Sequence, residues 1–94
     1  MRLSQAQINN FKSSVAAIDA EAKLYLFGSR ADDSKRGGDI DLAILSDKFG
    51  FEEECSFYKN YENEFEEEKI DLLIVKPPFD LAFWNYVKPN AILL

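Results

Sequence analysis

Histidine is absent from this sequence, and cysteine occurs once. Without histidine the chain cannot build a histidine-based catalytic triad or a histidine-containing metal site. The single Cys55 cannot form an internal disulfide. No apolar run approaches the roughly 20 residues that span a bilayer, and residues 1–4 lead into polar residues rather than the apolar core of a signal peptide. We therefore expect a soluble cytoplasmic protein.

Basic residues are also scarce. Eleven Lys and Arg stand against 17 Asp and Glu, which gives a formal net charge of −6. Proteins that grip a long stretch of nucleic acid neutralise its phosphates with a basic face, so this balance argues against a template nucleic acid. An anion bridged by a metal ion, or a cationic protein partner, fits the charge better.

Apolar residues, in contrast, are plentiful enough for a folded core. Hydrophobic residues make up 47% of the 94 residues and aromatic residues 14%, which is typical of a globular chain rather than a disordered one. A chain of this length has room for one modest core, so we expect residues 1–94 to form a single domain.

Periodic apolar residues and turn signals predict two helices and three strands. The elements that we expect are a helix from Ser4 through Ile18, strands over Lys23–Phe27, Ile40–Leu45 and Lys69–Val75, and a helix over Phe51–Phe65 whose apolar stripe is Phe51, Cys55, Tyr58, Tyr61 and Phe65. Residues 30–38 form a loop with room for a single helical turn. Strands interleaved with helices indicate an α/β domain with helices packed on its sheet.

The C-terminal tail begins after the third strand. Pro77 and Pro78 end that strand, and residues 79–86 predict a short helix, followed by an apolar end over residues 91–94. Trp84 and Phe83 either pack on the sheet or lie at an interface, and we favour packing.

Two short motifs point to a site. Gly28-Ser29 lies where a strand ends and a polar turn begins, a place where backbone N–H groups and a small hydroxyl can hold phosphate oxygens. Asp39 and Asp41 flank Ile40, and residues two apart in a strand point to the same face. Each motif alone also fits a plain alternative, a glycine that only ends a strand or an acidic surface strand.

Asp71 repeats the acidic pattern at the start of the third strand. If the three carboxylates converge, they repel one another, and a cation or a shifted pKa must offset the repulsion. Mg²⁺ suits a site whose ligands are all oxygen atoms.

Three segments together resemble the minimal nucleotidyltransferases of the DNA polymerase β superfamily. They are residues 26–31 (LFGSRA), 38–44 (GDIDLAI) and 69–75 (KIDLLIV). The family motif is Gly-Ser, a spacer that is commonly ten residues, Asp-x-Asp, and a later third Asp; here the spacer is nine residues, 30–38. The resemblance implies the nucleotidyltransferase fold, of class α/β (α+β), with a three-stranded mixed sheet in the order α-β-(loop/α)-β-α-β.

The resemblance also implies roles for the matching residues. Gly28 and Ser29 would hold the triphosphate of ATP or another NTP, Asp39 and Asp41 would be ligands of two Mg²⁺ ions, and Asp71 would bind the catalytic metal and act as the base. Arg30 either contacts a phosphate or is a solvated turn residue. The aromatic residues Tyr25 and Phe27 we assign to the core rather than to base stacking, and the Glu runs 52–54 and 66–68 to solvated surface rather than to a docking face.

Small members of this group are typically encoded beside a helical HEPN protein, with which they form a toxin–antitoxin pair, and some attach AMP to a tyrosine of that partner. This antitoxin-type adenylyltransferase is our first hypothesis, as a hetero- or homo-oligomer. A transferase acting on a small molecule such as an antibiotic hydroxyl is the second. A non-catalytic module that neutralises its partner by binding alone is the third.

Overall fold

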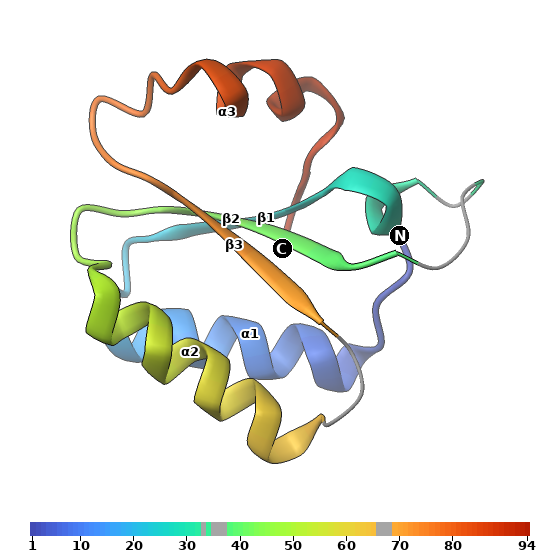
Figure 1. Ribbon diagram of the computed structural model, residues 1–94, viewed down its shortest axis with the longest axis vertical. Helices are drawn as coiled ribbons and strands as arrows, with labels where there is room; N and C mark the ends of the chain where they lie inside the picture. Colours follow the sequence, from blue (N-terminus) through green and yellow to red (C-terminus); the bar gives the residue numbers. More distant parts are fainter. Residues whose placement is uncertain (33, 35–37, 66–68) are drawn as a thin grey trace.

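The computed structural model describes residues 1–32, 34, 38–65 and 69–94, and Figure 1 shows a β-sheet with helices on both faces. The elements in chain order are α1 (Gln5–Ile18), β1 (Lys23–Phe27), the 3-10 helix η1 (Gly28–Ala31), β2 (Ile40–Leu45), α2 (Phe51–Glu64), β3 (Ile70–Val75), α3 (Ala82–Val87), the 3-10 helix η2 (Lys88–Asn90) and β4 (Ile92–Leu93). The predicted class, a mixed sheet with helices packed on it, is confirmed. Among the described residues no helix is long and apolar enough to cross a membrane.

The described sheet has four strands, in the order β3-β2-β1-β4, so the predicted count of three is wrong by one. β2 pairs antiparallel with β1 and parallel with β3, and β4 adds an antiparallel partner to the outer edge of β1. β4 contains two residues, which is too short for any periodic pattern to predict. The pairing of Leu26 with Ile92 and the bond from Leu94 N to Leu24 O (2.8 Å) fix its position.

The capping box predicted for α1 is present. Ser4 Oγ accepts a hydrogen bond from Gln7 N (3.1 Å), and Gln7 Oε1 accepts one from Ser4 N (2.8 Å). Two N–H groups that the helix itself leaves unpaired are thereby satisfied. The helix packs on α2 through Phe11, whose ring lies 5.8 Å from the Phe57 ring centroid and 5.0 Å from that of Tyr61.

The apolar face predicted for α2 is partly wrong. Phe51 is 81% exposed and Cys55 is exposed, whereas Phe57, which the predicted stripe omitted, is completely buried beside Tyr61. The buried face is centred on Phe57 and Tyr61, which lie four residues apart and therefore on one side of the helix.

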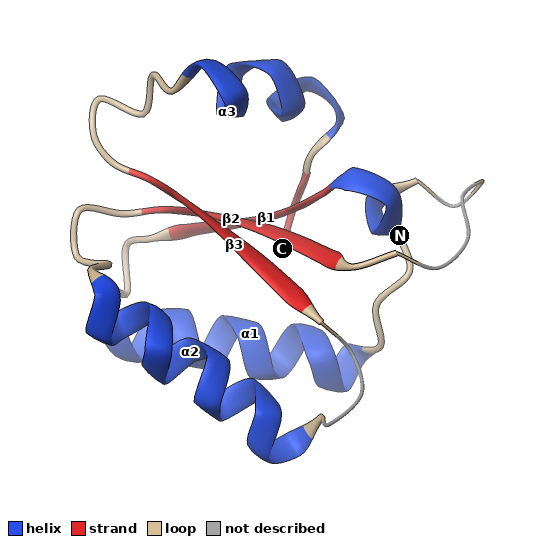
Figure 2. Ribbon diagram, in the orientation of Figure 1, coloured by secondary structure: helices blue, strands red, loops and turns tan. Residues whose placement is uncertain are grey.

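The sheet separates two cores. Alternate residues of the strands face α1 and α2, and the others, among them Phe27, Ala43 and Val75, face the opposite side, where Trp84 of α3 packs. Figure 2 shows α1 and α2 on one face of the sheet and α3 on the other. Trp84 is 1% exposed, and its ring lies 5.0 Å from that of Tyr25. The predicted packing of Trp84 on the sheet is thus confirmed.

Candidate active site

Asp41 and Asp71 lie side by side on the α3 face of the sheet. They are register partners in the parallel pair of β2 and β3, and both side chains point to the face that holds Ala43, because residues two apart in a strand share a face. Asp39 lies one residue before β2, whose bounds are those that we predicted for this strand. The pairing there begins one residue later, with Ile40 N donating to Lys69 O (3.0 Å).

Asp41 is affected by burial and by the two neighbouring carboxylates. The pKa of Asp41 is raised above its ordinary value, first by burial and then by the negative charges of Asp71 and Asp39. Lys69 acts in the opposite direction, and its Nζ atom lies 3.7 Å from Asp39 Oδ2 in a solvent-exposed ion pair. Ionisation of Asp41 therefore costs more free energy here than ionisation of a solvent-exposed aspartate.

Within the described part of the chain, no three Cys, Asp or Glu side chains are gathered closely enough to hold a metal ion by themselves. The donor set nevertheless suits a divalent cation, because it consists of carboxylate oxygens whose mutual repulsion a cation would relieve. Asp41 and Asp71 are the best placed of these ligands, because they are register partners on adjacent strands. Asp39 can join them if its carboxylate turns away from Lys69.

Gly28, the first residue of the η1 turn, lies directly against the side chain of Asp41. Its φ angle of +74° is one that side chains rarely adopt, and a Cβ atom there would overlap Oδ2 of Asp41. The antiparallel pairing of Phe27 with Asp41 creates this close approach. Only glycine lets the backbone of the turn lie directly against the carboxylate.

Gly38 is a second contact of this kind, and sequence reasoning treated it only as part of a loop. Its φ angle is +86°, and a Cβ atom there would overlap Ser29 Oγ. The end of the loop thus lies on the Ser29 side chain. The segment 38–44 (GDIDLAI), which carries part of the family resemblance, begins with Gly38 and was the signal that could have identified this contact.

Two arginines hold the η1 turn. Arg2 donates from its guanidinium to Ser29 O (2.9 Å) and from its backbone N to Arg30 O (2.9 Å). Arg30 donates in return to Arg2 O (3.1 Å) and to Gly38 O (3.3 Å). The side chain of Arg30 therefore contacts backbone carbonyls in this structure, which indicates that it positions the turn.

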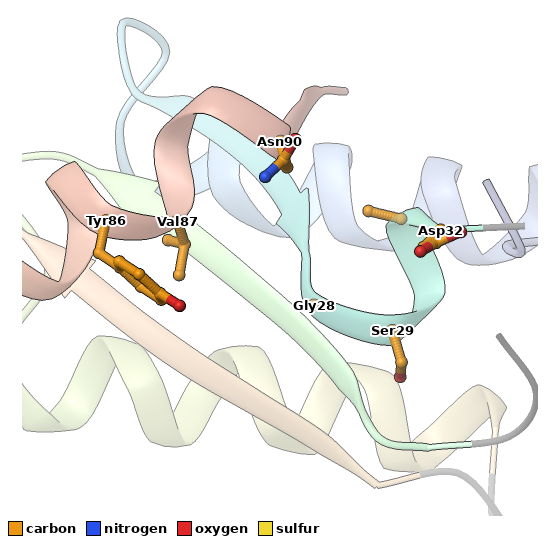
Figure 3. Close-up of a pocket in the computed structure, with 7 residues that line it drawn as sticks. Gly28, Ser29, Asp32, Tyr86, Val87 and Asn90 are labelled. Atoms are coloured by element: carbon orange, nitrogen blue, oxygen red, sulfur yellow. The ribbon is translucent and has the colours of Figure 1, made fainter. Parts of the chain in front are cut away.

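A cleft of about 600 Å³ opens beside the same turn. One wall is η1, with Gly28, Ser29, Ala31 and the neighbouring Asp32, and the other is Tyr86, Val87 and Asn90 from α3 and η2. Figure 3 shows these two sets of residues on either side of the opening. Sequence reasoning missed Tyr86, Val87 and Asn90, because nothing in the local pattern of the tail places them near Gly28.

The comparisons with known proteins agree with this geometry. The family model described as "Polymerase beta, Nucleotidyltransferase" matches residues 7–94, so the chain belongs to that family. A crystal structure of a protein provisionally described as a nucleotidyltransferase superposes with a TM-score of 0.66 at 22% identity, covering 95% of this chain and 98% of that one, and it supports the fold. No curated protein sequence matches. A nucleotidyltransferase-type activity, which uses a nucleoside triphosphate and a divalent metal, follows from the family.

Proposed function

We propose that the protein transfers a nucleoside monophosphate, AMP from ATP, onto a hydroxyl group in a Mg²⁺-dependent reaction. The observation that carries the proposal is the contact between Gly28 and Asp41, with Asp71 beside Asp41. A turn with free backbone N–H groups can hold phosphate oxygens. The adjacent carboxylates supply oxygen ligands for the divalent ions that such chemistry needs.

The chain's own residues would divide the work as follows. Gly28 and Ser29 would hold the triphosphate, Asp39 and Asp41 would be ligands of two Mg²⁺ ions, and Asp71 would be a ligand of one of them. The bound ions would compensate the negative charge of the triphosphate. The Arg30 side chain would support nucleotide binding by holding the turn through Arg2 and Gly38.

The proposed transfer needs only two reactants, the nucleoside triphosphate and the acceptor hydroxyl. The acceptor oxygen forms a bond to the α-phosphorus, and the bond from that phosphorus to the bridging oxygen of the β-phosphate breaks. Pyrophosphate leaves, and the carboxylate of Asp71 takes the hydroxyl proton. Asp71 is half-buried next to Asp41, so part of its side chain remains accessible to an acceptor that approaches from solvent.

The acceptor that we favour is a tyrosine of a HEPN-type helical partner, with the chain acting as antitoxin in the cytoplasm. The acidic pair lies on a sheet face that, among the described residues, carries one helix, the six-residue α3. Such a site offers little wall for a small acceptor, so the acceptor must bring its own surface and orientation. The net charge of −6 suits a basic protein partner.

Calorimetric titration tests the nucleotide site first. ATP with Mg²⁺ should bind the wild-type chain, and binding should weaken sharply in Asp39→Asn and in Asp41→Asn while the circular dichroism spectrum is kept. Equal ATP affinity in the double variant would refute the site.

Intact-mass spectrometry of the chain mixed with its partner, ATP and Mg²⁺ tests the transfer. One or more added AMP units on the partner, absent with the Asp39→Asn/Asp41→Asn variant, would support it. An unmodified partner that is still bound and neutralised would instead favour a non-catalytic binding module.

A further inference from the structure

The cleft between η1 and the α3–η2 segment is not occupied by any group of the proposed reaction described above. Its volume of about 600 Å³ is in the range of roughly 300–1,000 Å³ that small-molecule sites occupy. Gly28 and Ser29 belong both to the proposed phosphate turn and to the wall of this cleft. If the phosphates of a nucleotide contact Gly28 and Ser29, the rest of the nucleotide lies next to the cleft and can enter it.

Tyr86 supplies an aromatic surface that the fold does not use. It is 80% exposed although it lines the cleft. α3 is held on the sheet by other rings. Trp84 is buried, and the half-exposed Phe83 meets the Phe27 ring edge-on at a centroid distance of 6.0 Å. In Figure 3 the Tyr86 ring extends from α3 into the opening. An exposed aromatic ring in a cleft is a platform on which a nucleobase can stack.

Asn90 and Asp32 limit what the cleft accepts. The Asn90 amide carries both donors and an acceptor, as recognition of a base edge requires. η2 reaches this position because β4 starts two residues later and pairs with Leu26 near the end of β1. The Asp32 carboxylate lies on the opposite wall. Its negative charge disfavours an anionic group inside the cleft and therefore favours an uncharged group there, such as a nucleobase.

We propose that this cleft is the nucleoside subsite of the enzyme, in which the base of the nucleoside triphosphate stacks on Tyr86 and hydrogen-bonds to Asn90. The assignment rests on the proposed function, since it takes the triphosphate to lie on Gly28 and Ser29. Tyr86 contributes affinity for the base, and Asn90 contributes selectivity among bases.

Two ligands that share their phosphates separate this subsite from the phosphate site. ATP and inorganic tripolyphosphate are titrated, each with Mg²⁺, into wild type, Tyr86→Ala, Tyr86→Phe and Asn90→Ala. Phe51→Ala is the matched control, because Phe51 is an equally exposed aromatic residue (81%) on α2, across the sheet. Loss of stacking should lower the affinity of Tyr86→Ala for ATP by roughly 5- to 150-fold. Tyr86→Phe keeps the ring and should bind ATP like wild type.

The tripolyphosphate titrations decide the interpretation. Its affinity should be the same in wild type, Tyr86→Ala and Asn90→Ala, and Phe51→Ala should change neither ligand. Equal ATP affinity in wild type and Tyr86→Ala would overturn the subsite while the phosphate site stands. An equal loss of both ligands in Tyr86→Ala would show a structural effect on the turn and would also overturn it. If neither ligand binds wild type, the proposed function fails, and the subsite with it.

Discussion

Replacing Gly28 by alanine tests whether the η1 turn, the proposed phosphate site, is in direct contact with the carboxylate of Asp41, a proposed metal ligand. The new Cβ atom would overlap Asp41 Oδ2 and would sit at a φ angle of +74°. The substitution therefore lowers the free energy of unfolding in two ways, through the strained backbone conformation and through the overlap. Only the second depends on the Asp41 side chain.

The two costs can be estimated. A left-handed conformation costs a residue with a side chain about 1–2 kcal/mol, and the reduced freedom of the unfolded chain returns about 0.4–1 kcal/mol. Relieving the overlap requires an atomic shift that costs about 1–3 kcal/mol. Gly28→Ala should therefore lower the free energy of unfolding by about 2–4 kcal/mol in total. In an Asp41→Ala background the loss should fall to about 1 kcal/mol, because only the backbone cost is left.

The assay is a double-mutant cycle by urea unfolding without divalent ions, followed through the fluorescence of Trp84, the only tryptophan of the chain. Gly38→Ala is the matched control. Its φ angle is also positive, but its Cβ atom would meet Ser29 Oγ rather than Asp41, so its cost should be the same in both backgrounds. If Gly28→Ala costs as much with Asp41→Ala as without it, the turn and the carboxylate are not in the contact that the site requires.

Three further predictions concern other residues. Asp71→Asn should leave the metal-free stability unchanged or raised, because it removes one of several mutually repelling charges, and should lower transfer by orders of magnitude; a large loss of stability with normal transfer would make Asp71 structural. Hydrogen bonds from Ser46 Oγ (2.6 Å) and Glu21 N (3.0 Å) hold the pKa of the Asp19 carboxylate below 3.8. The stability that this carboxylate adds is present above that pH and lost as the pH falls through the lowered pKa, so the difference in unfolding free energy between wild type and Asp19→Asn should shrink in acid; a constant difference would contradict the reasoning. Arg30→Lys should weaken the binding of ATP and of tripolyphosphate to the same degree, because lysine cannot bridge both carbonyls that Arg30 contacts; a loss confined to ATP would mean that Arg30 contacts the nucleoside.

The sequence predicted the parts of the fold that depend on local pattern. The capping box of α1 and the strands β1, β2 and β3 follow from hydrogen-bonding residues and apolar runs at short spacing. The face of α2 was predicted with two wrong residues, Phe51 and Cys55, because several apolar stripes fit one aromatic-rich helix. Only the sheet and α1 decide which of them is buried, and they select Phe57 and Tyr61.

The same division runs through the candidate site. The acidic residues of the site could be found in two short segments of the sequence, around Asp39 and Asp41 and around Asp71. The parallel register of β2 and β3 places Asp41 beside Asp71. One wall of the neighbouring cleft comes from the tail. Tyr86 and Asn90 lie opposite Gly28 only because Trp84 packs on the sheet and β4 pairs with β1. Contacts of that kind join residues more than 50 positions apart, and no spacing rule encodes them. The residues proposed to hold phosphates and metal therefore belong to a recognisable motif, whereas those proposed to select the nucleoside depend on how the tail packs.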